Sequence, residues 1–160
     1  MRRVLPWVIG AVLALAGIAA VGLLASSRDE SNVAAAPEGP GQAQPEGSDP
    51  PASGPHADAL VTRDRRPISD DQLVEALELG NVVILYDATK PPPALVRLQE
   101  DIAGPFDAEL AAAGQAIVLA RRPGAGPATA LAYKRILRAD DPSDPALQDF
   151  AEFWLGRGIP

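Results

Sequence analysis

Hydrophobic residues follow three different patterns along this chain. Residues 4–25 form an apolar run of twenty-two residues without a charge. Residues 28–58 contain no Phe, Tyr or Trp and are rich in proline and glycine. From residue 59 onward, apolar positions recur with the spacings of helices and strands. The pattern therefore predicts an N-terminal transmembrane anchor over 1–27, a disordered linker over 28–58 and a folded domain over 59–160.

The first part has the length and the flanking charges of a membrane-spanning helix. At about 1.5 Å per residue, its apolar run would be roughly 33 Å long, and the hydrocarbon core of a bilayer is about 30 Å thick. Arg2 and Arg3 precede the run and Asp29 and Glu30 follow it, which favours a cytoplasmic N-terminus. A cleaved signal peptide is the alternative, although its apolar region usually has about 7–15 residues. We therefore expect an uncleaved single-pass anchor in the cytoplasmic membrane, with everything after Ser27 on the extracytoplasmic side.

The second part lacks the side chains that build a core. Six prolines alternate with four glycines between residues 37 and 55. Such a composition cannot bury enough apolar surface to offset the entropy lost on ordering. We therefore expect residues 28–58 to form a mobile tether.

Apolar spacing in the third part predicts alternating helices and strands. A helix begins at Ser69, which can form a capping box with Gln72, and ends at Gly80. The apolar run over 82–86 has the length and composition of a buried strand. The remaining expected elements are a helix over 92–103, a short helix over 107–113, strands over 116–119 and 129–138, and a helix from Asp144 to Gly156.

This order of elements predicts the fold class. A strand–helix–strand unit implies a parallel pair of strands. The short Pro- and Gly-rich turn over 122–127 implies that the third strand is antiparallel. We therefore predict an α+β protein, with an N-terminal transmembrane helix and a small two-layer domain in which helices cover a three-stranded mixed sheet.

Charge and composition exclude several classes of function. The 160 residues carry a formal net charge of −7, and none is cysteine. An acidic chain lacks the positive surface that nucleic acids require, and the missing cysteines exclude disulfides and thiolate chemistry. No Gly-x-Ser-x-Gly elbow, phosphate-binding loop or dinucleotide fingerprint is present. We therefore expect no enzymatic activity, no cofactor and no nucleic-acid partner.

One group of polar residues stands out as a candidate site. Asp71, Glu75 and Glu78 fall on one face of the helix predicted from Ser69. Such a face is most often the solvated side of an amphipathic helix. His56 is the only histidine of the sequence and lies in the predicted linker. Whether it joins the two glutamates is left open by the spacing alone.

Two other charged groups have simpler explanations. Turn propensity and helix capping account for Asp140, Asp141 and Asp144. Arg121 and Arg122 follow a predicted strand and could hold an anion, although a solvated strand end explains them as well.

Four stretches of the chain together resemble a bacterial family, the uncharacterised domain of unknown function 3105. They are residues 50–56, which end in Ser53-Gly54-Pro55-His56; residues 74–80 before the strand ending in Tyr86; residues 122–124 before 130–133; and the Asp-rich lead into the last helix. The resemblance runs from about residue 50 to the end. It implies a membrane anchor, a variable linker and one small domain, and no particular activity.

The same resemblance implies a metal site that this chain retains only in part. The family's usual Val-His-Ser-Leu-Glu-His-Gly places two histidines four residues apart on one helix face, near the histidine of its Ser-Gly-Pro-His segment. In this chain the corresponding positions are Glu75 and Leu79, and the family's cysteine is missing. The chain therefore resembles a degenerate member, in which His56, Glu75 and Glu78 are the remaining candidate metal ligands. Hard or borderline ions would suit such N and O donors.

Two functions follow as expectations. The first is a non-enzymatic, single-pass membrane protein that presents a small interaction domain to a protein partner outside the cytoplasmic membrane. The alternative is a metal-binding module of the cell envelope that uses His56, Glu75 and Glu78.

Overall fold

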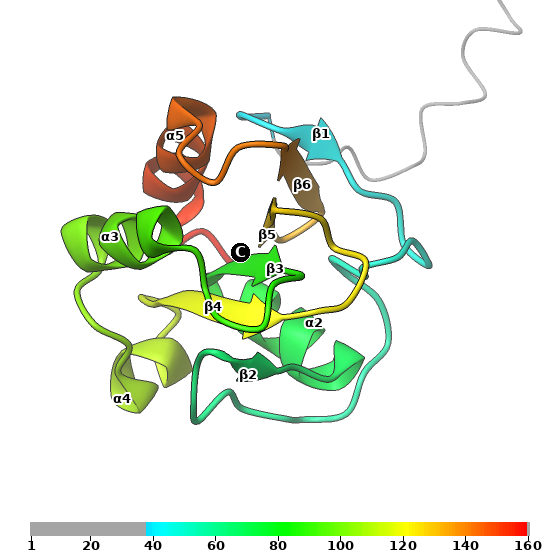
Figure 1. The fold of residues 1–160 in the computed structure, drawn as a ribbon. Coiled ribbons are helices and arrows are strands. Elements are labelled where there is room, and N and C mark those ends of the chain that lie inside the picture. The colour runs from blue at the N-terminus through cyan, green and yellow to red at the C-terminus, as the bar shows by residue number, and fades with distance from the viewer. Residues whose placement is uncertain (1–37, 160) are drawn as a thin grey trace, which may run out of the picture. The chain divides into compact units, whose positions relative to one another are not determined.

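The computed structural model describes residues 38–159, which form a small domain of mixed α and β structure (Figure 1). The prediction of that mixture is confirmed. The transmembrane helix predicted over 4–25 lies outside the described residues, and no helix within 38–159 has the length and apolarity needed to cross a membrane. In chain order the elements are β1 (Gln42–Ala43), β2 (Arg66–Pro67), α2 (Asp70–Leu79), β3 (Val82–Tyr86), α3 (Pro93–Ile102), α4 (Ala108–Ala112), β4 (Ile117–Arg121), β5 (Ala128–Ala132), β6 (Arg135–Ala139) and α5 (Pro145–Trp154).

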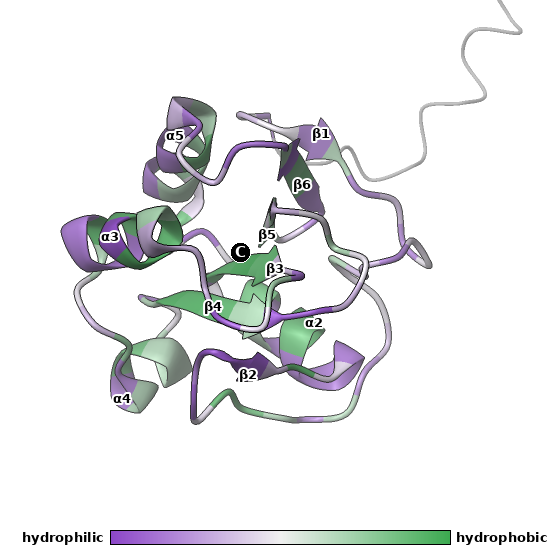
Figure 2. Cartoon of the chain, in the orientation of Figure 1, coloured by the Kyte–Doolittle hydropathy of each residue, from purple (hydrophilic) through white to green (hydrophobic). Residues whose placement is uncertain are grey.

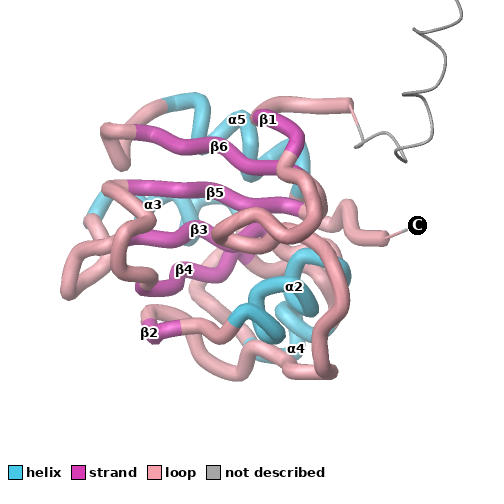
Figure 3. Tube along the Cα trace, turned by 90° about the vertical axis from the view of Figure 1, so that its right-hand side faces the viewer, coloured by secondary structure: helices cyan, strands magenta, loops and turns pink. Residues whose placement is uncertain are grey.

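The described strands form one six-stranded sheet in the order β1-β6-β5-β3-β4-β2 (Figure 3). Strands β3 and β4 are parallel and are joined through α3, as predicted. Strand β5 is antiparallel, also as predicted, but it pairs with β3 rather than with β4. The turn over 122–127 therefore crosses the end of β3, where the Asp87 amide donates to the Gly126 carbonyl at 3.1 Å.

The prediction of three strands is wrong for two reasons. The strand expected over 129–138 is a hairpin of β5 and β6, which turns at Tyr133 and Lys134. Lys134 adopts a φ of +58°, a conformation that Gly or Asn usually marks in sequence. The other missed strands, β1 and β2, have two residues each and lie at the edges of the sheet. Strands that short leave no recognisable hydrophobic pattern.

Helices cover both faces of the sheet, so the two-layer prediction is also wrong. Leu73 and Leu77 of α2 pack against Val83 and Leu85 on one face. On the other face, α3 and α5 pack against the alternate residues of the same strand, Val82, Ile84 and Tyr86. Strands β3 and β4 are green along most of their length in Figure 2, because a strand buried on both faces is apolar at nearly every position.

The local signals of the helix ends are confirmed. Ser69 Oγ accepts from the Gln72 amide at 3.2 Å, and the Ser69 amide donates back to Gln72 Oε1 at 3.3 Å. Gly80 ends α2 with a φ of +111°. Asp144 caps α5 by accepting from the Ala146 amide at 2.9 Å. The capping box of Ser69 and Gln72 fixes where α2 begins, which matters for the site described below.

Residues 38–56, here called the arm, correct the linker prediction over this part of the chain, whereas residues 28–37 of the predicted linker lie outside the described residues. The arm forms the edge strand β1, which pairs with β6, and then continues toward α2. Ala52 within it is fully buried. The arm contacts the domain largely through its backbone. Trp154 Nε1 donates to the Pro40 carbonyl at 2.9 Å, and the backbone amide of Gln44 donates to the Lys134 carbonyl at 2.9 Å. At Gly39, an added Cβ would overlap the rings of Phe153 and Trp154. The absence of large side chains, which predicted disorder, is here what allows close packing.

Candidate functional site

An open cleft of about 460 Å³ lies between the arm and the first half of α2. The arm contributes one wall and the helix contributes the other. The polar and charged side chains that line it are Glu46, Ser48, Asp49, Ser53, His56, Asp70 and Asp71. Four of these are carboxylates, so the cleft is acidic.

All three predicted site residues meet at one end of this region. His56 Nε2 lies 3.0 Å from Glu75 Oε2 and 3.8 Å from Glu78 Oε2. The two glutamates are three residues apart on α2, a spacing that places side chains side by side on a helix. The arm brings His56 to them across nineteen residues of sequence. The structure therefore brings these three residues together, and their role as metal ligands stays a prediction.

The surroundings of His56 favour its protonated form. Nδ1 lies 3.1 Å from the Gly54 carbonyl, which can only accept, so Nδ1 carries a hydrogen. Nε2 faces two carboxylates. The hydrogen bond to Gly54 raises the pKa of His56 above its ordinary 6.5; partial burial opposes this rise, and Glu75 and Glu78 add to it. The cluster is thus a hydrogen bond between the arm and α2, which carries charge when His56 is protonated.

As they stand, these residues do not form a preformed metal site. Within residues 38–159, no group of three or more His, Cys, Asp or Glu is placed to hold an ion. The donor types nevertheless fit a divalent cation. Tetrahedral bonds of about 2.0–2.2 Å would place ligand atoms about 3.3–3.6 Å apart, between the two observed separations. Binding would require Nε2 to give up its proton, and Leu79 supplies no ligand.

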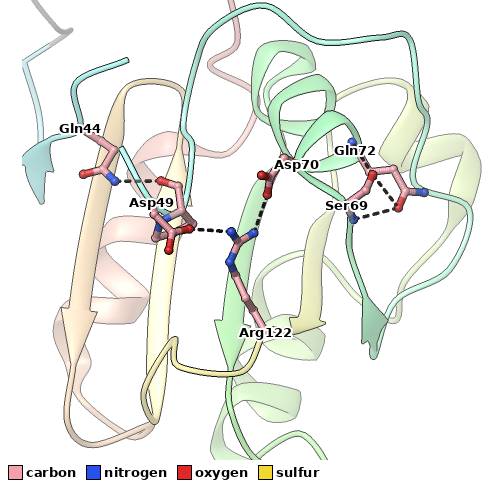
Figure 4. Close-up of polar contacts among 7 residues, drawn as sticks. Gln44, Asp49, Ser69, Asp70, Gln72 and Arg122 are labelled. Atoms are coloured by element: carbon pink, nitrogen blue, oxygen red, sulfur yellow. Dashed lines mark hydrogen bonds and ion pairs between the residues drawn. The ribbon is translucent and has the colours of Figure 1, made fainter. Parts of the chain in front are cut away.

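Arg122 forms a second link between the arm and α2 (Figure 4). Its Nη2 lies 2.6 Å from Asp49 Oδ1 in the arm, and its Nη1 lies 2.7 Å from Asp70 Oδ1 at the start of α2. Burial lowers the pKa of the guanidinium, but hydrogen bonds and charge from Asp70 and Asp49 outweigh this and raise it. The anion site considered for Arg121 and Arg122 is therefore taken up, at Arg122, by the chain's own carboxylates.

The arm contains two buried polar side chains, Gln44 and Ser53, of which Ser53 lines the cleft. Gln44 Nε2 donates to the Pro50 carbonyl at 2.8 Å, which closes the loop that carries Asp49 (Figure 4). Ser53 is 5% exposed, and its Oγ is buried without a hydrogen-bond partner from residues 38–159. Sequence reasoning missed Glu46, Asp49 and Ser53 because it placed them in a mobile linker.

The site has a definite position relative to the sheet. Arg122 directly follows β4, and Asp70 follows β2 by three positions. Both groups therefore lie beyond the carboxyl ends of parallel strands. Sheets of this kind commonly bind their ligands in crevices outside that edge.

Comparison with known proteins gives one match. The family model described as "Protein of unknown function (DUF3105)" matches residues 45–158. No curated protein matches the chain, and no solved structure matches it either. The matched region begins inside the arm and includes His56, α2 and the whole sheet from β2 onward. The chain therefore belongs to the DUF3105 family, whose function is unknown.

Proposed function

We propose that this protein is a single-pass membrane protein that presents a non-catalytic interaction domain to a protein partner outside the cytoplasmic membrane. The anchor and its orientation rest on the apolar run over 4–25 and on Arg2 and Arg3 before it. The observation that carries the interaction role is the cleft between the arm and α2, an open surface rich in charged side chains.

The chemistry of the cleft supports binding rather than turnover. A nucleophile needs a base whose free nitrogen or oxygen can accept its proton. His56 is held by the acceptors Gly54 and Glu75 in a way that favours a hydrogen on both ring nitrogens. Ser53 Oγ, the buried hydroxyl of the cleft, has no hydrogen-bond partner among the described residues. These side chains offer a ligand contacts and charge.

Photocrosslinking in native membranes tests the proposed role. A photoreactive residue replaces Ser48 in the cleft, and a matched one replaces the exposed Gln148 on α5. We expect a discrete crosslinked partner from position 48. Crosslinks from neither position would contradict the interaction role. Hydrolase or redox turnover by the purified chain, abolished by one polar substitution, would contradict the non-catalytic role.

The proposed orientation has its own test. A reporter active only outside the cytoplasm, fused after Pro160, should be active, and the protein should remain with membranes after an alkaline carbonate wash. Replacing Arg2 and Arg3 with Asn while changing Ser26 and Ser27 to Arg should lower the reporter activity. An inactive wild-type fusion would contradict the orientation, and a soluble cleaved product would contradict the anchor.

A second candidate function is the binding of a divalent cation by His56, Glu75 and Glu78. It is favoured by the convergence of one imidazole nitrogen and two carboxylates within 3.0 and 3.8 Å. Calorimetric titration of the purified full chain with zinc and nickel provides the test, in parallel with His56→Ala and with Gln148→Ala as the matched control. Heat that is lost in His56→Ala and kept in the control supports this function. No heat above buffer, or equal heat from all three proteins, contradicts it.

A further inference from the structure

We infer that the cleft between the arm and α2 binds a positively charged segment of the partner protein, so this inference rests on the interaction role proposed above. Glu46 and Asp71 supply the first reason. Both line the cleft and are exposed, and no lysine or arginine within residues 38–159 forms an ion pair with either. Their charge is therefore available to a cation from outside.

The chain itself shows that carboxylates at this cleft can hold a cationic side chain. Arg122 reaches Asp49 and Asp70 at 2.6 and 2.7 Å, one from each wall. The spacing of arm and helix thus accommodates a guanidinium between them. Glu46 and Asp71 likewise come one from the arm and one from the first turn of α2, and neither forms an ion pair within residues 38–159; Asp71 Oδ1 accepts from the Ala57 amide at 3.3 Å.

Ser53 gives an independent indication of a ligand. It lines the cleft, it is 5% exposed, and its Oγ has no hydrogen-bond partner within residues 38–159. Buried hydroxyls are normally hydrogen-bonded, so an unpaired one at a binding surface is a place for a ligand atom. A peptide offers backbone carbonyls to such a donor, whereas a simple amine or a metal ion offers none.

The character of the cleft also favours a macromolecular ligand. Sites for small molecules are enclosed and mainly apolar, with few polar groups. This cleft is open, and Arg122 pairs with two of its four carboxylates, so that Glu46 and Asp71 are the two without an ion pair among residues 38–159. Charge of one sign on a surface attracts and orients a segment of opposite charge on a partner. A Lys- or Arg-bearing segment meets both the carboxylates and Ser53.

The test measures binding of fluorescein-labelled tetralysine amide to the full chain in a non-ionic detergent by fluorescence anisotropy at low salt. We expect saturable binding that is weakened about tenfold in Glu46→Gln/Asp71→Asn. The matched control is Glu100→Gln/Asp101→Asn, which removes the same charge from two exposed positions of α3. Equal binding by both double variants, or no saturable binding by the wild type, overturns the inference.

Ser53→Ala separates a peptide ligand from a simple amine. It should weaken tetralysine binding severalfold and leave competition by 1,4-diaminobutane unchanged. The melting temperature should stay the same or rise, because Oγ makes no hydrogen bond in the part of the chain that the structure describes. Full competition by the diamine at concentrations equal to the peptide's would overturn the commitment to a peptide.

The two proposals fail in distinguishable ways. A crosslink at position 48 that persists in Glu46→Gln/Asp71→Asn leaves the interaction role standing and overturns the charged-segment inference. Loss of that crosslink in this variant, with retention in Glu100→Gln/Asp101→Asn, supports both. Crosslinks from position 148 alone would place the partner elsewhere and likewise overturn this inference.

Discussion

The two faces of the sheet are covered in different ways. On one face, α3 and α5 present large apolar side chains, including the fully buried Leu95, Leu147 and Phe150. On the other face, α2 covers the sheet together with the arm, which contributes one small core residue, Ala52. Charged contacts, at His56 and at Arg122, join the arm to α2.

This difference separates stability from binding. Apolar burial is the dominant source of folding free energy, and the α3/α5 face holds the buried aromatic side chains Tyr86, Phe150 and Trp154. The α2 face instead exposes polar groups on an irregular segment, which is where proteins most often place binding residues on a rigid scaffold. The substitutions below should therefore cost much stability on the first face and little on the second.

The largest expected effect is on the α3/α5 face. Phe150→Ala removes a fully buried ring and should lower the free energy of unfolding by about 3–5 kcal/mol. Phe153→Ala is the matched control, because its half-buried ring packs edge-on against Trp154 with centroids 4.8 Å apart and should cost about 1–2 kcal/mol. Urea denaturation measures both. Equal losses would contradict the assignment of this stability to the full burial of Phe150.

A second substitution tests how the arm meets that face. Gly41 has a φ of +84°, and an added Cβ would lie 2.6 Å from the Phe150 ring and 2.8 Å from the Ile136 carbonyl. Gly41→Ala should therefore cost about 2–4 kcal/mol from backbone strain and overpacking together. Gly47→Ala has a similar φ of +78° with nothing within 4 Å, so only the strain of about 1–2 kcal/mol should remain. A similar loss in both variants, again from urea denaturation, would argue against tight packing of the arm on α5.

The sequence predicted the elements that carry their own local signals. Ser69 with Gln72, Gly80 and Asp144 mark helix ends through side-chain hydrogen bonds or a positive φ, which depend on neighbouring residues only. The hairpin turn at Lys134 and the two-residue edge strands carry no such signal, and so the strand number was wrong. The secondary-structure propensity of a residue depends on its neighbours in sequence, whereas the pairing of an edge strand depends on tertiary contacts.

The candidate site was predictable to the same extent. Glu75 and Glu78 share a helix face by spacing, and His56 was singled out as the one histidine. Asp49 and Arg122, however, are 73 residues apart, and only the folded arm brings them together. The ordered structure of the arm could not be predicted from its composition. Backbone hydrogen bonds and close packing at glycines hold the arm on the domain, and apolar side chains contribute little.

On the α2 face, the His56 contact should contribute pH-dependent stability. Because the folded state raises the pKa of His56, its contribution is fully present below about pH 6.5 and is lost as the pH rises through the folded pKa. His56→Gln should therefore cost up to about 1 kcal/mol at pH 5.5 and almost nothing at pH 9. Urea denaturation at both pH values measures this. Glu75→Gln should flatten the same profile, whereas a loss of equal size at both pH values would show that packing, rather than charge, holds the arm.

The smallest effect is expected at Arg122, because its two partners are exposed: the Asp49 side chain at 85% and the Asp70 side chain at 64%. Exposed ion pairs contribute about 0.2–1 kcal/mol, so Arg122→Ala should cost less than about 1 kcal/mol at low salt. Since the Debye length falls to about 3 Å in 1 M salt, the cost should shrink further there.

Arg122→Lys keeps the positive charge but loses the two guanidinium nitrogens that bind two carboxylates at once, and it should recover part of the stability lost in Arg122→Ala. Arg97→Ala on the exposed side of α3 controls for the loss of one positive charge. A cost that persists in 1 M salt would mean that the aliphatic stem of Arg122 packs between the arm and α2. The α2 face would then depend less on charge than its comparison with the α3/α5 face implies.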